Sequence, residues 1–597
     1  MSAETPNPQS PSISRRDLLK ALGLAGAGTV VVQATGGLGM ARTLAMDLPE
    51  VSSDVGRGRH VVILGGGVGG LTAAFKLQQA GFVCTVLEAR SVVGGRSLTL
   101  RRGDVLVEKP LLPYKDTGQR ESAQTCVFRP GGATGYDRPY LNAGPGRIPS
   151  AHTHVLDLCK ELAVPLEVYI MESRSNLVHG RAPSRVNRHV ANDARGWIAQ
   201  ELYLRVDEIE GLNGSQRTAL RQLLIEFGSL GNGKVGKPGI YAENGKYQRP
   251  DQARAGYKVL PGVDDGIPVD PLPLTEVLDT GFWATRFYQP EDFLWQPTLF
   301  QPIGGMDRIV GALVKAVGSR NVRTDAVVRG IEFDKATDQW ILEVAGHSPI
   351  RAHACISNIP MPLLEKPLGN LDQQPFPPDF KAALRNVFGI DATGTGGFLA
   401  PTTKVGWQAP RALWQQPDPA VNRVVPIFGG ISWTSHPMTQ LWYPSDRIFD
   451  ELGVLTGAYN FGADATQWGQ FSPYWRLQQA RTGAQDLGGD AFADGLAAGL
   501  AIAWQNIEHL RGGWAQWQNV PDGEASYNAL LAGARDSRFY ICGDQMSQLP
   551  GWQEGAVASA LHATAMLCVP TFTAPTVDSV PDSRMMVEGM ISFDLDG

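Results

Sequence analysis

A glycine-rich turn followed by an acidic residue is the part of this chain whose residue types and spacing point most directly to chemistry. The glycines form the pattern Gly65-x-Gly67-x-x-Gly70, and Glu88 follows about twenty residues later. Glycine permits a tight turn and lets backbone N–H groups approach a pyrophosphate at the positive end of a helix. A carboxylate at the position of Glu88 accepts the two hydroxyls of a ribose and disfavours a 2′-phosphate. The spacing therefore predicts a dinucleotide site.

The sequence on either side of the turn predicts the strands and the helix that would position these residues. An apolar run, Val61–Leu64, precedes the glycines, a helix-period segment, Leu71–Gln79, follows them, and a second apolar run, Val83–Leu87, ends at the acid. This order predicts a strand–turn–helix–strand unit of the Rossmann kind.

Three residues, Gly94-Gly95-Arg96, indicate which dinucleotide is bound. The pattern GGGVGG…VLEAR…VGGRS resembles the opening of flavin-dependent amine oxidases. The resemblance implies FAD rather than NAD, with Arg96 against the pyrophosphate. A guanidinium beside a diphosphate makes bidentate, charge-assisted hydrogen bonds. The alternative is a surface arginine that follows a glycine turn.

Arg147 carries the expectation for substrate class. Its context, NAGPGRIP, resembles the GP-x-R motif of L-amino-acid oxidases, whose arginine clamps the substrate carboxylate while the adjacent backbone meets the flavin. A guanidinium suits a planar two-oxygen anion, and oxidases of neutral amines do not need one there. The alternative is an arginine in a structural salt bridge.

Two further substrate-side residues come from the same resemblance. Tyr443, in Leu-Trp-Tyr-Pro, matches a family tyrosine whose hydroxyl binds the same carboxylate, and Trp442 departs from the family's first aromatic residue, a change that could narrow the side-chain pocket. Lys404 matches the family lysine that holds a water against flavin N5. For Tyr443 the alternative is packing before a strand-ending proline. For Lys404 it is an edge-strand lysine that reaches solvent.

The C-terminal region resembles the family at a second motif. Asp544 stands seven residues before Gly551-Trp552, where the family has Glu. Because Asp is shorter than Glu, the resemblance does not define which atom of the FAD ribityl–phosphate region Asp544 would bind. The resemblance makes Trp552 an aromatic wall over the isoalloxazine ring and the Gly551 carbonyl an acceptor from the substrate amine. The start of the last helix, at Gly555-Ala556, would face the N1–C2 end of the flavin. In the related monoamine oxidases a cysteine in this region attaches FAD, and because no cysteine lies between residues 543 and 556 here, the resemblance implies noncovalent FAD.

The resemblance assigns roles to three groups of residues. Lys404 and Trp552 are the expected catalytic residues, and Arg147, Tyr443, Gly551 and Trp552 are expected to bind substrate. No motif identifies a catalytic base, although His179 and His189 lie near the inserted helical region, and no metal site is expected. The expected cofactor-binding residues are Gly65, Gly67, Val68, Gly69, Gly70, Glu88, Ala89, Gly95, Arg96, Gly144, Pro145, Gly146, Arg147, Val328, Asp544, Gly551, Trp552, Gln553, Gly555 and Ala556.

The layout resembles that of the family, and the resemblance implies an α/β fold with α+β insertions, in which a discontinuous Rossmann-like FAD-binding domain joins a mixed-sheet substrate domain and an inserted helical domain. FAD-binding segments are expected at 57–105, 300–370 and 536–570. Between them lie a loop insertion with the opening segment of the substrate domain at 106–190, a helical or substrate insertion at 191–299, and the remainder of the substrate domain at 371–535. A loose tail is expected at 571–597.

The composition and the N-terminal segment indicate which partners and which location to expect. The 597 residues carry a formal net charge of −6, which gives no basic surface for nucleic acid. The six cysteines have no metal-type spacing, and we expect free, buried thiols. Residues 1–45, with Ser14-Arg15-Arg16-Asp17-Leu18-Leu19-Lys20, resemble a twin-arginine export signal; the alternative, a membrane anchor, has too few apolar residues. We expect the twin-arginine translocation (Tat) machinery as a partner, a periplasmic or secreted location, and a homodimer or higher homo-oligomer.

The expected activity is the oxidative deamination of an L-amino acid by FAD and O₂ to a 2-oxo acid, ammonia and hydrogen peroxide. Two rival activities remain open. A flavin amino-acid 2-monooxygenase would form an amide and CO₂ at the same site, and an amine or polyamine oxidase would not need Arg147. A noncatalytic FAD-fold protein fits less well, because the substrate-side residues are present.

Overall fold

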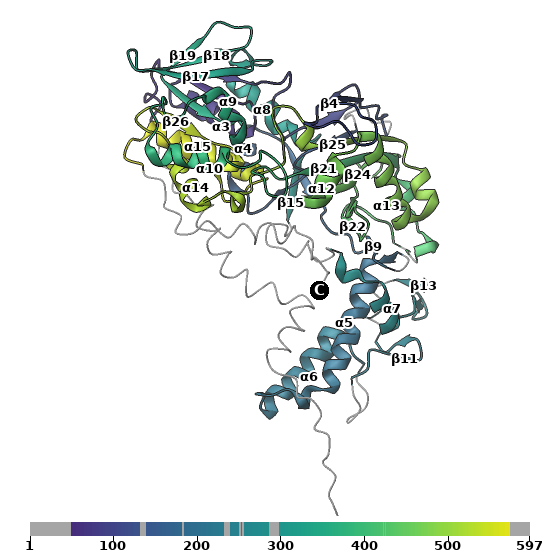
Figure 1. Ribbon diagram of the computed structural model, residues 1–597. Coiled ribbons are helices and arrows are strands. Elements are labelled where there is room, and N and C mark those ends of the chain that lie inside the picture. The colour runs from purple at the N-terminus through teal and green to yellow at the C-terminus, as the bar shows by residue number, and fades with distance from the viewer. Residues whose placement is uncertain are drawn as a thin grey trace, which may run out of the picture.

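The computed structural model describes residues 49, 51–131, 139–181, 184–231, 239–249, 252, 256–285, 298–421, 423 and 425–572 (Figure 1). The signal peptide expected at 1–45 and all but the first two residues of the tail expected at 571–597 lie outside the described residues.

Three distant stretches of the chain form one parallel sheet. Its five strands pair in the order β16-β2-β1-β20-β26. Their bounds are His60–Leu64 (β1), Val83–Leu87 (β2), Val322–Arg323 (β16), Ala354–Ser357 (β20) and Phe539–Ile541 (β26). Each of the three FAD-binding segments expected from the sequence contributes at least one strand. A parallel sheet is covered on both faces, which is why β1 and β2 are continuous apolar runs in the sequence.

The two faces of this sheet pack into different cores. Val61 and Ile63 face a core formed with α3 (Val68–Gln79), α8 (Asp307–Val317) and α15 (Gln553–Cys568), and α4 (Thr153–Glu161) joins the same core. Val62 and Leu64 face the second core, whose elements are β17 (Val328–Asp334), β18 (Gln339–Val344), β19 (Ile350–Ala352), α9 (Glu365–Leu368), α10 (Pro378–Phe388) and α14 (Gly523–Ala532).

A seven-stranded sheet forms the body of the second domain, to the right in Figure 1, and its strand order is β10-β9-β22-β23-β24-β21-β25. The strands are Leu177–His179 (β9), Arg185–Val186 (β10), Thr402–Pro410 (β21), Ile431–Thr434 (β22), Gln440–Trp442 (β23), Leu452–Phe461 (β24) and Ala498–Ala503 (β25). One face packs against α11 (Ala412–Gln415), α12 (Gly462–Gly469) and α13 (Pro473–Asp494). The opposite face carries an aromatic cluster that includes Trp433, Trp442 and Tyr459.

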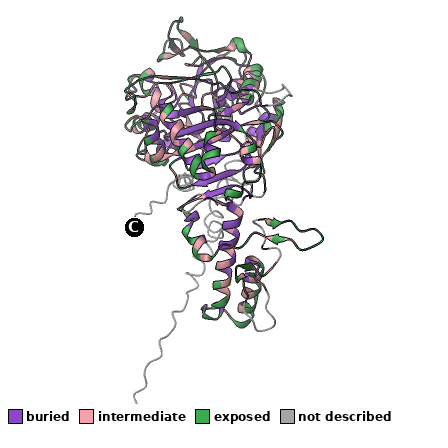
Figure 2. Cartoon of the chain, turned by 90° about the vertical axis from the view of Figure 1, so that its right-hand side faces the viewer, coloured by how far each residue is buried: buried purple, intermediate pink, exposed green. Residues whose placement is uncertain are grey.

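A helical arm stands away from the two domains (Figures 1 and 2). It contains α5 (Asn187–Leu204), α6 (Gly214–Gly228), α7 (Leu274–Asp279) and two short hairpins, β11 (Ala242–Glu243) with β12 (Lys246–Tyr247) and β13 (Tyr257–Val259) with β14 (Ile267–Pro268). Asp193 organises the arm, because its buried carboxylate accepts hydrogen bonds from the Tyr241 hydroxyl at 2.5 Å and the Leu272 N–H at 2.7 Å.

A hairpin of β4 (Val105–Glu108) and β5 (Ser122–Thr125) lies at the start of the region 106–190, where the sequence predicted a loop insertion. Further short strands form two small sheets, ordered β3-β6 and β7-β15-β8. Their bounds are Thr99–Arg101 (β3), Tyr140–Asn142 (β6), Ile148–Pro149 (β7), Leu166–Tyr169 (β8) and Leu299–Pro302 (β15). All six cysteines are buried and none is paired in a disulfide. Within the described residues, no helix combines the length and the apolar character that crossing a membrane requires.

Candidate active site

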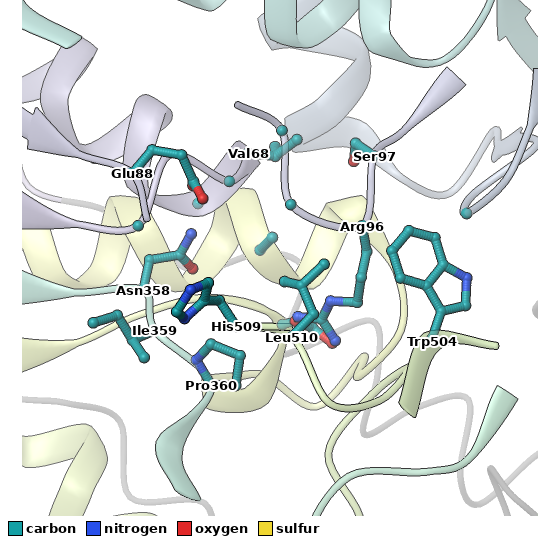
Figure 3. Close-up of a pocket in the computed structure, with 18 of the residues that line it drawn as sticks. Val68, Glu88, Arg96, Ser97, Asn358, Ile359, Pro360, Trp504, His509 and Leu510 are labelled. Carbon is teal, nitrogen blue, oxygen red and sulfur yellow. The ribbon is translucent and has the colours of Figure 1, made fainter. Parts of the chain in front are cut away.

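A long cavity opens where the parallel sheet meets the second domain. Its empty volume is about 1270 Å³ including its open mouth. It lies against the glycine turn after β1, the end of β2 and the start of α15 (Figure 3). Sixteen expected cofactor residues line it: Gly65, Gly67, Val68, Gly69, Glu88, Ala89, Gly95, Arg96, Gly144, Pro145, Val328, Asp544, Gly551, Trp552, Gln553 and Ala556. The other four, Gly70, Gly146, Arg147 and Gly555, are not among its lining residues.

The glycine turn is shaped by close backbone packing. Gly65 has φ +94°, a conformation that favours glycine. A Cβ on Gly70 would come within 2.1 Å of the Gly65 carbonyl oxygen, so Gly70 permits close contact between helix and strand and does not face the cavity. A Cβ on Gly67 would lie 2.7 Å from Nδ2 of Asn358. The turn therefore contacts Asn358 directly.

Glu88 lies at the end of β2 as the sequence predicted. Its Oε2 accepts from the Gly66 N–H and its Oε1 from the Arg90 N–H, both at 2.9 Å. Burial raises the pKa of the carboxyl, and these backbone hydrogen bonds oppose the rise. Each oxygen retains a further lone pair for a hydroxyl donor.

Arg96 and Asp544 form an ion pair in the cavity wall, an arrangement that the sequence analysis did not predict. Nη1 of Arg96 donates to Oδ2 of Asp544 at 3.1 Å, and the two groups make a second, shorter contact. Oδ2 of Asp544 also accepts from the Gly551 N–H at 2.9 Å. Asp544 therefore connects the expected phosphate arginine to the loop that carries Gly551 and Trp552.

Two helix N-termini converge on the cavity. α3 begins at Val68 and α15 begins at Gln553, two residues earlier than the sequence predicted. Among the described residues, neither helix has a side chain that caps its first N–H groups. Gly555 has a packing role, because a Cβ there would lie 2.1 Å from the Ser547 hydroxyl oxygen. The two ends present partial positive charge to whatever occupies the cavity.

Arg147 is buried between two tryptophans. Its guanidinium carbon lies 4.7 Å from the ring centroid of Trp442 and 5.4 Å from that of Trp552, at cation–π distances. Burial lowers its pKa to about 10, so the group remains a cation at neutral pH. The loop 144–146 joins it to the cavity, since Gly144 and Pro145 line that cavity.

Lys404 is in the interior of the sheet, so the edge-strand alternative is wrong. β21 lies between β24 and β25, and the lysine is 2% exposed. Its Nζ donates to the Gly144 carbonyl at 2.6 Å and to the Asn142 carbonyl at 3.1 Å, and lies 4.5 Å from the ring centroid of Tyr459. Burial, reinforced by the positive charge of Arg147, lowers the pKa of Lys404 to about 7.

The structure does not bring Tyr443 to Arg147. The Tyr443 hydroxyl bonds to Oγ of Ser432 at 3.0 Å, and its ring packs 6.0 Å from Trp414 in the core behind the sheet. Trp442 is the last residue of β23 and packs in the aromatic cluster at the site, whereas Tyr443 follows the strand and packs in the core on the opposite face of the sheet. The phenols that influence Arg147 are those of Tyr169 and Tyr459, which sequence reasoning missed.

The histidines considered as bases lie away from these residues. His179 is on β9 with Nδ1 3.5 Å from the Thr434 hydroxyl, and His189 lies in the arm with Nε2 3.0 Å from Asp193. His152 was missed: it is buried, and its ring packs edge-on against Trp552 at 4.9 Å. Burial lowers the pKa of His152 to about 4, so it is neutral at physiological pH.

Two polar residues in the cavity also escaped prediction. Asn358 directly follows β20, a parallel strand that pairs with β1. Because ligands bind at the carboxyl ends of parallel strands, this position could have indicated a cavity residue. His509 lies in a loop without a motif, and nothing in its sequence context marked it.

Comparison with known proteins decides the family. Residues 129–567 match the flavin containing amine oxidoreductase family, and residues 63–125 match an NAD(P)-binding Rossmann-like domain. The chain belongs to the flavin containing amine oxidoreductase family. The resemblance inferred from the motifs and the expected α/β fold are thereby confirmed.

Relatives within this family include amino-acid oxidases. The flavin-dependent L-tryptophan oxidase RebO of Lentzea aerocolonigenes is 24% identical over 85% of this chain and 97% of its own. An L-amino-acid oxidase of Crotalus adamanteus is 24% identical over 68% of this chain and 67% of its own. Among solved structures, a putrescine oxidase variant aligns with a TM-score of 0.50 at 16% identity, over 86% of this chain and 100% of its own, a likeness of fold.

The cavity fits the flavin cofactor of this family. Glu88 is positioned for a ribose, the N–H groups of α3 and Arg96 for a diphosphate, and the start of α15 for the electron-rich edge of the flavin ring. Trp552 and Gly144 line the end nearest Arg147 and Lys404. Within the described residues, no group of three His, Cys, Asp or Glu side chains could hold a metal ion.

Proposed function

We propose that the protein oxidises an L-amino acid to the corresponding 2-oxo acid, with release of ammonia and hydrogen peroxide. The observation that carries the proposal is Arg147, a buried cation stacked between Trp442 and Trp552 on the loop that lines the flavin cavity. A buried cation has a large desolvation cost, which an anionic substrate would offset. The names of the amino-acid oxidases among the relatives agree with this choice.

In this proposal each residue has one task. The Arg147 guanidinium binds the substrate carboxylate, and the Gly551 carbonyl accepts a hydrogen bond from the amine. Trp442 and Trp552 exclude water and orient Cα. Bound FAD would supply the redox chemistry, a two-electron oxidation of the substrate at Cα coupled to the reduction of O₂ to hydrogen peroxide. Water then hydrolyses the released imino acid to the 2-oxo acid and ammonia.

Lys404 is a group that could take up or release a proton next to the proposed substrate site. Its Nζ is held by the carbonyls of Gly144 and Asn142, and its pKa of about 7 lets it exchange a proton near neutral pH. Tyr459 and Tyr169 are the candidates for the hydroxyl that we had expected from Tyr443.

A product assay separates this proposal from its rivals. The purified protein is mixed with each of the twenty L-amino acids, with putrescine and with simple monoamines, and peroxide, ammonia and CO₂ are measured. Peroxide and ammonia from amino acids alone support the proposal. Amide and CO₂ would indicate the 2-monooxygenase, and equal turnover of amines lacking a carboxylate would indicate an amine oxidase.

The Arg147→Ala variant tests the residue that carries the proposal. Removing the charged partner of a buried carboxylate costs about 2–5 kcal/mol, so kcat/KM for amino acids should fall roughly 30- to several-thousand-fold. Arg147→Lys should also be poor, because an ammonium cannot form the bidentate pair. The flavin absorption spectrum serves as the control and should stay close to that of the parent. Unchanged kcat/KM would show that Arg147 is structural.

A further inference from the structure

The turn formed by His509, Leu510 and Arg511 borders the cavity on the side away from the glycine turn. His509 and Leu510 both line the cavity, as do Asn358 and Pro360. In Figure 3 the imidazole of His509 lies opposite Glu88, beside Asn358, and Leu510 lies between it and the Trp504 end of the cavity. None of the motifs identified in the sequence analysis includes this turn.

The position of the imidazole along the cavity indicates what it would meet. Glu88 marks the ribose end, and Trp504, whose indole N–H donates to the Ala143 carbonyl at 3.1 Å, marks the end next to Gly144. Between them lie the first N–H groups of α3, which suit phosphate oxygens. An imidazole on the wall opposite Glu88 faces the ribose end of a bound dinucleotide and the diphosphate that adjoins this ribose.

The turn holds an uncommon backbone conformation. His509 has φ +67° and Arg511 has φ +59°, and both are non-glycine residues in the left-handed region. Such conformations cost energy and persist where the surrounding structure requires them, often at ligand clamps. Here they bring the His509 ring and the Leu510 side chain toward the cavity from one short turn.

Lys109 holds the turn from outside. Its Nζ pairs with Glu508 at 2.9 Å, its carbonyl accepts from Nη1 of Arg511 at 2.8 Å, and its N–H donates to the Asn506 carbonyl at 2.7 Å. A single residue directly after β4 thus contacts the chain on both sides of His509. The Glu508 carboxylate is occupied by this lysine.

The charges around His509 favour an anionic neighbour. Arg511, Arg90 and Lys109 are the nearby cations and Glu508 is the nearby anion; burial, assisted by these cations, lowers the pKa of His509. The Glu88 carboxylate and the Arg96–Asp544 pair also line the cavity. A bound diphosphate would counter the cations and favour protonated imidazole, which makes a charge-assisted hydrogen bond.

We propose that the 509–511 turn is a clamp for the cofactor, in which His509 donates a hydrogen bond to the diphosphate of FAD and Lys109 holds the turn in place. The clamp concerns the cofactor and does not depend on which amine is oxidised. It makes retention of FAD stronger at mildly acidic pH, where the imidazole is charged, than at alkaline pH.

Release of FAD from the holoenzyme tests the clamp. The protein is diluted at pH 6 and at pH 8, and the rise of free-flavin fluorescence gives the release rate. His509→Asn is the informative variant, because asparagine tolerates the left-handed backbone but lacks the charge. We expect it to release FAD about 10- to 100-fold faster at pH 6 and to lose most of the dependence on pH. Lys109→Met should also release FAD faster.

Matched controls keep the result interpretable. His347→Gln removes an exposed histidine distant in sequence from the turn and should behave as the parent. Unchanged release from His509→Asn would overturn the proposal, and so would release accelerated equally at both pH values, which indicates a merely structural role. Unchanged release from Lys109→Met would refute the anchoring step. If no flavin leaves any variant, the noncovalent premise fails and the clamp with it.

Discussion

At the residue scale, burial lowers the pKa of Lys404 into the range where its charge can affect the reaction with O₂. Its pKa of about 7 means that the ammonium is charged below this pH and neutral above it. Reduction of O₂ builds negative charge, so the cationic form should accelerate that half-reaction, and the rate should fall as pH rises through about 7. We predict that Lys404→Met slows oxygen consumption by reduced enzyme roughly 100-fold and removes this pH dependence. Stopped-flow measurement of the oxidative half-reaction would check it.

Anaerobic reduction by substrate should change much less in Lys404→Met, because Arg147 and the flavin site remain. Lys315→Met, on the exposed side of α8, is the matched control. A variant that reacts with O₂ at the parent's rate at every pH would exclude a role for Lys404 in this step.

At the element scale, the β4–β5 hairpin is tied to the second domain by one buried ion pair. Both side chains, Glu108 and Arg476, are fully buried and 2.7 Å apart. Glu108 also accepts from the Tyr114 hydroxyl at 2.8 Å and the Ala503 N–H at 2.9 Å. We predict that Arg476→Met lowers the free energy of unfolding by about 3–5 kcal/mol, because it leaves a buried carboxylate without its cation. Urea denaturation would measure the loss.

The double variant Glu108→Gln, Arg476→Met should recover some of that loss, since both charges are then absent. Arg385→Met breaks an exposed pair with Asp372 and should cost less than about 1 kcal/mol. Equal losses from Arg476→Met and Arg385→Met would contradict the special role of burial. Lys109 follows β4 of this hairpin, so the Arg476→Met variant should also release FAD faster than the parent.

At the scale of the whole molecule, the flavin site requires nearly the entire chain. β1 begins at residue 60, whereas β26 and α15, which complete the sheet and the cavity, end at residues 541 and 568. FAD can therefore be loaded only after synthesis, and an export route for folded proteins suits such an enzyme. We predict that replacing Arg15 and Arg16 together by lysine retains active, FAD-loaded protein in the cytoplasm. Activity and flavin in cell fractions would show it.

Arg42→Lys, in the same N-terminal segment but outside the pair, is the control for the export experiment and should leave export unchanged. Export of the double-lysine variant at the parent's level would point to another route and remove the support for a twin-arginine signal.

The sequence by itself determined the elements whose pattern is local. The strand, glycine turn and helix around Gly65–Gly70, the acid at Glu88 and the last helix all follow from periodicity and spacing over a few tens of residues. Tertiary structure decided which side chains meet. Tyr443 turned away and Trp442 turned inward because strand register sets the face, and Lys404 became interior because β24 and β25 flank its strand. Asn358 and His509 reach the same cavity from distant segments, and no local pattern records a contact that depends on how those segments pack.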